Sequence, residues 1–541
     1  MARRLPLGIQ DFAKIRENNF IYVDKTERIY QLINGSVTAC FLSRPRRFGK
    51  SLLCSTLGAI FEGRRKLFDE TGGTPLAINS LEWDWKKHPV IRLDLNAGLY
   101  SDGIDALYSV LTAELGREAR KQKIELEPAD VASQFKMLIE KACARTGEKA
   151  AVIIDEYDKP LLASIDKPEL FEGFRNALKG FYGVLKSYDE YLRFIFLTGV
   201  TKFSHVSIFS DLNHLDDLTL NPKYADLCGI TQEELERNFT PEIDAVLEVN
   251  KKDRGTYLSE LRRFYNGYRF SKNNITVYNP FGILHHFDKA GEFLPYWYNS
   301  GTPAFLVKLI AEQKIDILNL DKLAVTYADF SKYDIAGMKA EPLLYQSGYL
   351  TITDYDAELN EFILDYPNEE VRASFAKSLM EQYFEAPDEN SRTLTTDLVR
   401  AFTHGKPEDA LTAVKIFLSK IPYDIIKEKE NYYQTAVHLI FTMLGLNCRS
   451  EVKIASGRID TLVETKNYVY CFEFKLNGTV KQALAQIDSK EYLLPWKRPD
   501  YNGERNGKTL FKIGVEFDHK HHNIGAWEAR KENSEISNRQ P

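Results

Sequence analysis

The chain has 541 residues, of which 44% are hydrophobic and 27% charged, and its formal net charge is −6. These values are typical of a soluble globular protein with about two to four domains. No run approaches the roughly 18 consecutive apolar residues of a membrane span, and the N-terminus lacks a secretory apolar segment. Six scattered cysteines form no Cys-x-x-Cys pair, which argues against a zinc knuckle or a disulfide scaffold. We therefore expect a cytoplasmic protein with no membrane partner.

The charge is unevenly distributed along the chain. Residues 1–50 carry a balance of +6 and residues 449–541 a balance of +3, which leaves −15 for the remainder. Local positive charge favours ligands that bear phosphate. Ordinary fluctuation of surface charge explains the same pattern about as well. The choice between the two explanations therefore depends on the motifs within these basic ends.

The first 230 residues alternate short apolar runs with longer helical patterns. The apolar runs lie at 39–43, 90–95, 151–155 and 193–198, separated by helix-like segments such as 51–62, 105–121 and 132–144. This alternation predicts an α/β domain, a parallel sheet covered by helices on both faces.

The rest of the chain changes character twice. Helical patterns dominate residues 231–396, with one strand-like pair at 348–353 and 361–365, which predicts a helical and winged-helix-like middle region. A third unit, 397–529, passes through helices into a strand-rich stretch at 449–476 and predicts a C-terminal α/β domain. The polar residues 530–541 are expected to be a disordered tail.

A candidate phosphate-binding loop lies in the first domain. Residues 43–51 read Ser-Arg-Pro-Arg-Arg-Phe-Gly-Lys-Ser and lie between an apolar strand and an apolar helix, the context in which Gly-Lys-Ser binds a nucleotide. Lys50 is expected to reach the β- and γ-phosphates and Ser51 to ligate Mg²⁺. Backbone groups of Arg47, Phe48 and Gly49 would cradle the phosphates. Arg44 replaces the first Walker A glycine, which predicts a stiffer, more basic loop.

Two further strands end in polar residues that suit the same site. The run 151–155 ends in Asp155 and is followed by Glu156; Asp155 can hold Mg²⁺ through water and Glu156 can polarise the attacking water. The run at 193–198 ends in Thr198, which either senses the γ-phosphate or simply caps the strand. Together with the loop around Lys50, these residues predict an ATP and Mg²⁺ site.

Several long motifs resemble a prokaryotic family whose members join an AAA-ATPase-like P-loop domain to a C-terminal PD-(D/E)XK nuclease domain of restriction-endonuclease-like fold. The matching segments are LPLGIQDF at 5–12, YVDKT at 22–26, SRPRRFGKS at 43–51, IDEYDKP at 154–160, FYNGY at 264–268 and WYNSGTP at 297–303. The resemblance covers nearly the whole chain. It implies ATP binding, and Arg44 in the first Walker position is what this family looks like.

A predicted hairpin in the third unit gathers a second set of charged residues. The arms 457–465 and 468–475 are rich in β-branched and aromatic residues, and a two-residue loop joins them. Pairing Thr465 with Tyr468 sets Asp460 opposite Glu473, with Cβ atoms roughly 4.5–5.5 Å apart. Lys475 lies on the same face as Glu473. Facing carboxylates repel unless a cation lies between them, and oxygen ligands suit Mg²⁺ or Mn²⁺.

The alternative for this hairpin is a solvated charged face neutralised by Lys475 and Arg458. Asp, twelve residues, then Glu-Phe-Lys also resembles the core of PD-(D/E)XK nucleases, which favours a metal site with Lys475 as a catalytic group. Gln486, in the helical segment 480–492, resembles the glutamine that often follows this core. Glu430 is the candidate for an additional metal-binding acid, or else a carboxylate favoured by a helix start.

These observations predict an ATP-binding protein with a Mg²⁺-dependent nuclease domain that hydrolyses phosphodiester bonds of nucleic acid, with DNA expected, under control of the ATPase domain. The alternative is a nucleotide-dependent switch or interaction ATPase whose nuclease-like domain binds nucleic acid without cutting it. A second rival is an ATPase that acts on protein partners. A homo-oligomer is compatible with any of these three functions.

Overall fold

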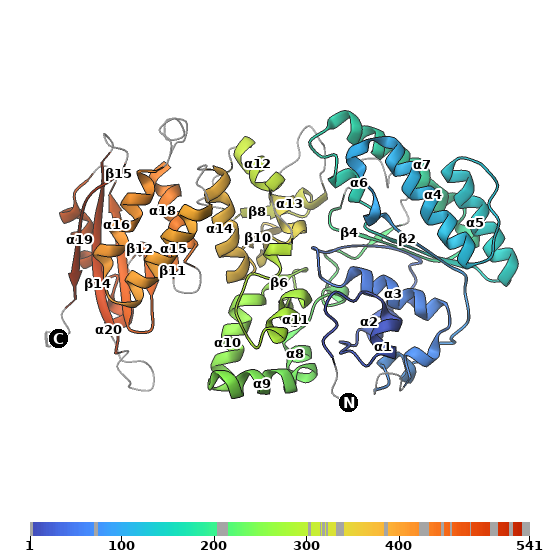
Figure 1. The fold of residues 1–541 in the computed structure, drawn as a ribbon, viewed down its shortest axis with the longest axis horizontal. Helices are drawn as coiled ribbons and strands as arrows, with labels where there is room; N and C mark the ends of the chain where they lie inside the picture. Colours follow the sequence, from blue (N-terminus) through green and yellow to red (C-terminus); the bar gives the residue numbers. More distant parts are fainter. Residues whose placement is uncertain are drawn as a thin grey trace. The chain divides into compact units, whose positions relative to one another are not determined.

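The computed structural model describes residues 4–69, 74–202, 215–300, 304–313, 315, 320, 323–331, 340–383, 388–420, 432–444, 448–454, 457–475, 478–497, 507–518 and 523–532. The chain divides into two compact units, Met1–Ser300 with Asp321–Asn368, and Gly301–Leu320 with Glu369–Pro541 (Figure 1). Among the described helices, none combines the length and the apolar character that crossing a bilayer requires.

The first unit is built on a five-stranded parallel sheet in the order β2-β3-β4-β1-β5. Its strands are β1 (Ala39–Ser43), β2 (Val90–Asp94), β3 (Ala150–Asp155), β4 (Leu192–Gly199) and β5 (Asp216–Asp217). All residues of β1 and β3 are buried, as expected of parallel strands covered on both faces. The predicted P-loop α/β sheet is therefore confirmed.

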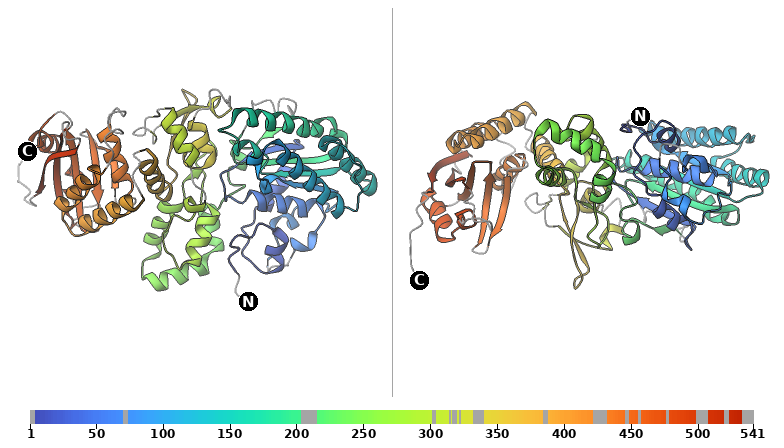
Figure 2. Two further views of the ribbon diagram at one scale, coloured as in Figure 1. Left: turned by 45° about the horizontal axis from the view of Figure 1, so that its top comes forward. Right: turned by 90° about the horizontal axis from the view of Figure 1, so that it is seen from below.

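Helices cover both faces of this sheet (Figures 1 and 2). On one side lie α1 (Phe12–Glu17), α2 (Thr26–Ile33) and α3 (Lys50–Phe61); on the other lie α4 (Ile104–Lys121), α5 (Val131–Thr146), α6 (Lys159–Leu162) and α7 (Pro168–Ser187). Parallel strands need such crossovers. The connections place the carboxyl ends of β1, β3 and β4 at one edge of the sheet, where ligands of open α/β folds bind.

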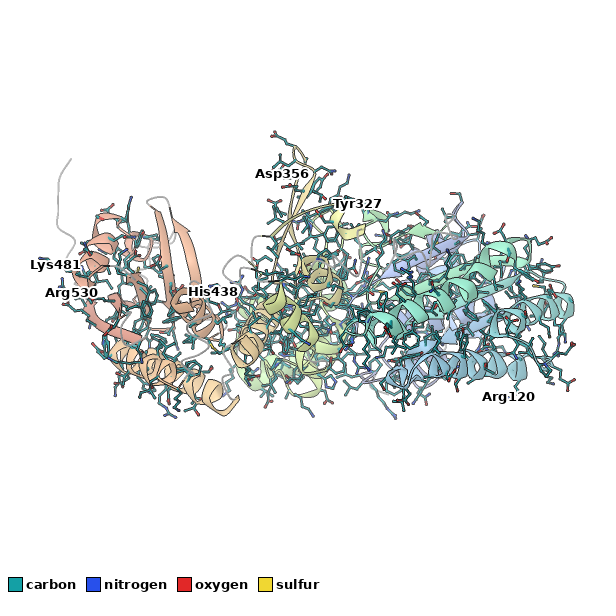
Figure 3. The ribbon with its side chains drawn as sticks, turned by 90° about the horizontal axis from the view of Figure 1, so that it is seen from above. Arg120, Tyr327, Asp356, His438, Lys481 and Arg530 are labelled. Carbon is teal, nitrogen blue, oxygen red and sulfur yellow. The ribbon has the colours of Figure 1, made fainter. Side chains whose placement is uncertain are left out.

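The middle of the chain is helical, as predicted. Helices α8 (Gln232–Asn238), α9 (Thr240–Asn250), α10 (Arg254–Tyr265) and α11 (Pro280–Asp288) enclose an apolar core with the short β6 (Tyr268–Arg269) and β7 (Thr276–Val277) beside it. Helix α13 (Ala340–Ser347) precedes β9 (Thr351–Asp356) and β10 (Glu361–Asp365), which form an antiparallel sheet with β8 (Leu323–Thr326). The β9–β10 hairpin projects from this unit, with Asp356 near its tip (Figure 3).

The second unit holds a mixed five-stranded sheet in the order β11-β12-β13-β14-β15. The strands are β11 (Cys448–Ile454), β12 (Gly457–Glu464), β13 (Tyr468–Lys475), β14 (Thr509–Asp518) and β15 (Asn523–Lys531), and only β13 and β14 pair in parallel. Helix α19 (Val480–Ser489) packs on one face through Ile487, against Leu462 and Cys471. On the other face, Phe402 and Phe441 contact Phe472. The predicted restriction-endonuclease-like fold is confirmed.

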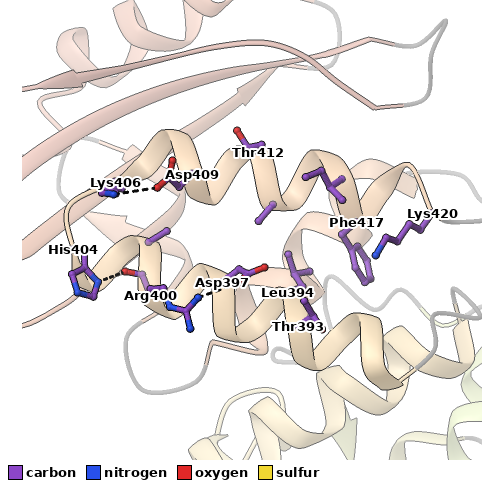
Figure 4. A pocket seen from close by; sticks show the side chains of 13 residues that line it. Thr393, Leu394, Asp397, Arg400, His404, Lys406, Asp409, Thr412, Phe417 and Lys420 are labelled. Atoms are coloured by element: carbon purple, nitrogen blue, oxygen red, sulfur yellow. Dashed lines mark hydrogen bonds and ion pairs between the residues drawn. The ribbon is translucent and has the colours of Figure 1, made fainter.

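Further helices complete this unit: α12 (Ala304–Glu312), α14 (Glu369–Tyr383), α15 (Asp388–Thr403), α16 (Pro407–Leu418), α18 (Tyr432–Thr442) and α20 (Leu494–Lys497). A groove of about 590 Å³ runs between α15 and α16 (Figure 4). Its ion pairs, Arg400–Asp397 at 3.9 Å and Lys406–Asp409 at 3.8 Å, are long and exposed, so they contribute little to stability. Strand β15 continues to Lys531, two residues into the expected tail; residues 533–541 lie outside the described part of the chain.

Candidate functional site

The loop between β1 and α3 contains two residues with positive φ. Gly49 has a φ of 93° and Arg47 a φ of 66°, and α3 begins directly at Lys50. The Lys50 ammonium is buried and donates to the carbonyls of Arg44 and Pro45 at 3.1 and 3.2 Å. It also lies 3.8 Å from a Glu156 carboxylate oxygen. Positive φ at a non-glycine residue marks strain that functional loops often hold.

Asp155 and Ser51 meet beside this loop. Asp155 is fully buried, and its Oδ2 atom has no hydrogen-bond partner within the described part of the chain. Burial, aided by the charge of Glu156, raises the pKa of Asp155 to about 6, against the lowering effect of a Ser51 hydrogen bond. A buried, unpartnered carboxylate oxygen next to a serine hydroxyl is a donor set that fits Mg²⁺.

A cavity of about 330 Å³ opens beside this loop; Ser51 lines it, whereas the buried Asp155 is not part of its wall. Its walls carry the predicted Arg47, Gly49, Lys50, Ser51 and Glu156, and also residues that the sequence analysis did not single out: Arg46, Asp94, Asn96 and Lys159. Asp94 could have been found, because it is the polar residue near the end of the run predicted at 90–95; in the structure it ends β2 and is paired with Asp155 in the β2–β3 ladder. Phe48 instead faces a neighbouring, mainly apolar cavity of about 110 Å³.

Thr198 lies at the end of β4, as predicted, and its side chain is fully buried. Its hydroxyl donates to the Leu42 carbonyl of the adjacent β1 at 2.7 Å. This hydrogen bond links β4 to β1, which gives Thr198 a structural role. A role in sensing the γ-phosphate stays a prediction.

Arg44 corrects one expectation, because its charge does not enter the phosphate cavity. The guanidinium donates to the carbonyls of Ser43, Thr219 and Tyr224 at 2.8, 2.9 and 3.0 Å and lies 4.2 Å from the Phe270 ring centroid. The side chain is 1% exposed, and burial lowers the pKa of this group. Arg44 therefore stabilises the loop through buried hydrogen bonds and does not add charge to the phosphate cavity.

We expect Arg44→Met to destabilise the first unit by about 2–4 kcal/mol, because three buried carbonyls would lose their donor. Thermal or denaturant unfolding of the full chain measures the change. The matched control is Arg46→Met, since Arg46 is exposed on the same loop and should cost at most about 0.5 kcal/mol. Equal stability of the two variants would contradict the anchoring role.

Segments more than 200 residues away also support this loop. Trp297 donates its indole N–H to the Arg46 carbonyl at 2.9 Å, and Tyr268 packs edge-on against Phe48 with ring centroids 4.7 Å apart. Gly348 has a φ of 90°, and a Cβ there would meet Pro45 at 2.8 Å. The motifs around Tyr268 and Trp297 therefore brace the phosphate loop.

The C-terminal hairpin has the predicted register from Thr461 to Glu464; the direct pairing of Asp460 with Glu473 stays a prediction. Thr461–Glu464 pair with Phe472–Val469, and the Thr465 amide donates to the Tyr468 carbonyl at 2.8 Å. One step further along this register, the Asp460 carboxylate accepts a hydrogen bond from the Phe474 amide at 2.9 Å. Asp460 and the end of β13 are therefore held side by side.

Glu473, Lys475 and Gln486 form a hydrogen-bonded chain beside Asp460. The Lys475 ammonium donates to Glu473 Oε1 at 2.8 Å and to Gln486 Oε1 at 2.7 Å, and Gln486 donates to the Tyr492 hydroxyl at 3.3 Å. Glu473, Lys475 and Gln486 were predicted as site residues. Tyr492 was not predicted, because it reaches this cluster only through the turn after α19. Four predicted site residues are thus gathered in one place.

The electrostatics of this cluster fit a divalent cation. Glu473 is 2% exposed, and its buried Oε2 atom accepts no hydrogen bond from any residue that the structure describes. Burial raises the pKa of Glu473 to about 7; Asp460 adds to the rise and Lys475 opposes it. Within the described residues, no three His, Cys, Asp or Glu side chains converge on one point, so water, phosphate or another acid must supply further ligands. Glu430 lies outside the described residues.

This raised pKa predicts a pH effect on the metal-free protein. Between about pH 4.5 and 7 the native state holds a proton at Glu473 that the unfolded state releases, so stability falls as pH rises through this window. The loss is on the order of 3 kcal/mol. In EDTA, the stability of Glu473→Gln should not show this fall between pH 4.5 and 7, and at pH 8 the variant should be more stable than the wild type. Thermal unfolding at pH 5 and pH 8 tests it.

The control for that measurement is Glu464→Gln, a partly buried acid on the same hairpin that pairs with Lys508 at 2.7 Å. Its stability should follow the wild-type pH profile. A Glu473→Gln variant with the same pH profile as the wild type would show that this carboxylate is not strained by burial.

A P-loop sheet joined to a mixed sheet with an Asp/Glu/Lys hairpin defines an ATPase-like protein with a restriction-endonuclease-like domain. Residues 6–209 match the family model described as predicted AAA-ATPase, and residues 428–527 match that of the PD-(D/E)XK nuclease superfamily. A protein of Azotobacter chroococcum mcd 1, described as an uncharacterized protein in the vnfD 5′ region, is 37% identical over 528 residues, covering 95% of this chain and 96% of its own length. The chain belongs to the family that joins these two domains.

Proposed function

We propose that this protein is an ATP-binding, metal-dependent nuclease that hydrolyses phosphodiester bonds of DNA under control of its ATPase domain. The observation that carries the proposal is the cluster of Asp460, Glu473, Lys475 and Gln486. Its buried Glu473 Oε2 atom has no hydrogen-bond partner among the described residues, and its cation, Lys475, is held in place by two acceptors. Such a cluster suits phosphate chemistry better than structural support, since an unpartnered buried carboxylate is costly.

In the nuclease domain, Asp460 and Glu473 would hold Mg²⁺ or Mn²⁺. When bound, the ion would lower the pKa of a coordinated water and neutralise charge on the scissile phosphate. Lys475 would orient the attacking water, and Gln486 would hold Lys475 in position. Lys481 lies on the first turn of α19 (Figure 3). It is exposed, as is Lys490 at the end of the helix; both would contact the nucleic-acid backbone.

In the ATPase domain, Lys50 would leave its present carbonyl partners for the β- and γ-phosphates. Ser51 and Asp155 would hold Mg²⁺, directly and through water, and Glu156 would polarise the water that attacks the γ-phosphate. The adjoining apolar cavity shares Gly49 and Leu52 with the phosphate cavity, so it is positioned to receive the adenine base. Free thiols at all five cysteines whose side chains are described agree with a cytoplasmic protein.

The test is a cleavage assay with the purified full chain. Single- and double-stranded DNA and RNA are incubated with it in Mg²⁺ or EDTA, with and without ATP. We expect DNA to be cut in Mg²⁺ and the rate to change with ATP. Retention of DNA without cutting in any of these conditions would favour the alternative, a nucleotide-dependent switch that binds nucleic acid. Cutting that is indifferent to ATP would remove the control by the ATPase domain.

A further inference from the structure

The turn that follows β3 presents two opposite charges to the phosphate cavity. Glu156 and Lys159 both line this cavity, whereas the two residues between them, Tyr157 and Asp158, are fully buried. Two residues that line the cavity therefore flank two buried residues that fasten the turn. The proposed function uses Glu156 and leaves Lys159 without a role.

The two buried residues fasten the turn to the end of β4. One Asp158 oxygen accepts from the Val200 amide at 3.0 Å and from both the amide and the hydroxyl of Thr201 at 2.6 Å. The Tyr157 amide donates to the Thr198 carbonyl at 3.1 Å, and its hydroxyl donates to the Thr201 carbonyl at 2.9 Å. Five hydrogen bonds therefore fix the backbone from which Lys159 projects, which lowers the entropy cost of using its side chain.

Lys159 and Arg46 differ from Lys50 and Arg47, the other two cations of the cavity wall, in what they contact; of these two, Arg46 is exposed on the phosphate loop, whereas Lys159 is partly buried. Lys50 donates to two carbonyls of its own loop, and the Arg47 guanidinium lies 5.0 Å from the Phe281 ring centroid. Among the residues that the structure describes, none forms a hydrogen bond or an ion pair with the partly buried Lys159 ammonium. An ammonium at a cavity wall without a partner is suited to an anionic ligand.

The position of Lys159 indicates which phosphate it would meet. The phosphate loop reaches the nucleotide from β1, whereas Lys159 comes from the turn after β3, three residues beyond Glu156. In the proposed site Glu156 acts on water next to the γ-phosphate, so a cation on the same turn approaches the terminal phosphate and not the α- or β-phosphate. Thr198, the sensor that the sequence suggested, already donates its hydroxyl to Leu42.

We propose that Lys159 binds the terminal phosphate of ATP and is the residue by which this domain distinguishes ATP from ADP. The inference rests on the proposed nucleotide site. In the ATP complex the ammonium forms a charge-assisted hydrogen bond to a γ-phosphate oxygen, and in the ADP complex it has no phosphate within reach.

The experiment compares the affinities of the full chain for MgADP and for the Mg²⁺ complex of the β,γ-imido analogue of ATP, which keeps the ligand intact. Lys159→Ala should weaken binding of the ATP analogue about 10- to 100-fold and leave ADP affinity within about twofold. Lys159→Arg, which keeps the charge, should recover part of the preference. The matched control is Lys167→Ala, an exposed lysine at the start of α7, which should bind both nucleotides like the wild type.

The outcomes distinguish a failure of the proposed nucleotide site from a failure of the role of Lys159. A wild type that binds neither nucleotide contradicts the nucleotide site and, with it, the role of Lys159. A wild type that binds both, with Lys159→Ala showing an unchanged preference or an equal loss for both nucleotides, overturns the inference alone. Thermal unfolding of each variant without nucleotide verifies that it is folded, and a misfolded Lys159→Ala is replaced by Lys159→Met in the same comparison.

Discussion

Lys475→Ala is expected to reduce DNA cleavage in Mg²⁺ at least about 100-fold and to leave metal binding and DNA binding nearly unchanged. The reason is that the substitution removes the charged donor that would orient the attacking water, while Asp460 and Glu473 keep their carboxylates. Single-turnover cleavage of a labelled duplex measures the rate, and titration with Mn²⁺ measures the metal site.

The control for this prediction is Lys490→Ala. Lys490 is exposed at the end of α19, and its substitution removes the same charge from the same domain. It should weaken DNA binding slightly and cut at a rate close to that of the wild type. Equal cleavage by wild type and Lys475→Ala would contradict the catalytic role. Loss of Mn²⁺ binding in Lys475→Ala would instead assign the lysine to holding Glu473.

Lys50→Ala is expected to weaken MgATP binding at least about 100-fold, since the charge-assisted hydrogen bonds to two phosphates are lost together. If the ATPase domain controls the nuclease, the same variant should cut DNA at the rate that the wild type shows without ATP, whatever ATP concentration is added. Calorimetric titration with MgATP and a cleavage assay over a range of ATP concentrations measure the two effects.

Lys66→Ala serves as the control for Lys50, because Lys66 is an exposed lysine of the same domain outside the phosphate cavity. It should keep both ATP binding and the response of cleavage to ATP. If Lys50→Ala bound ATP as the wild type does, the phosphate loop would not be the nucleotide site. If it lost ATP but cleavage still responded to ATP, control would have to come from elsewhere.

Local patterns were enough to predict much of the fold. The strands at the centre of the first sheet were predicted to within one residue, because fully buried parallel strands produce unbroken apolar runs. The register of the hairpin followed from its two-residue loop, since a loop of that length allows few pairings. Both features depend on residues close together in the sequence.

What could not be predicted depends on contacts between distant segments. The sequence indicates that Arg44 is a cation in a phosphate loop, but only the carbonyls of Thr219 and Tyr224 show that its side chain points away. The bracing of the loop by Trp297 spans 251 residues. The partnership of Lys475 with Gln486 requires knowing how α19 packs on β13. Side-chain direction in these cases is set by tertiary packing, which no local pattern encodes.

The most direct test of the metal-dependent nuclease site is titration of the nucleotide-free full chain with Mn²⁺, for the wild type, Asp460→Asn and Glu473→Gln. The account predicts that the wild type has a site that both variants lose or weaken at least about tenfold, because each variant replaces a charged oxygen ligand with a neutral amide. Mn²⁺ binding of equal affinity in all three proteins would contradict a metal centre at this hairpin.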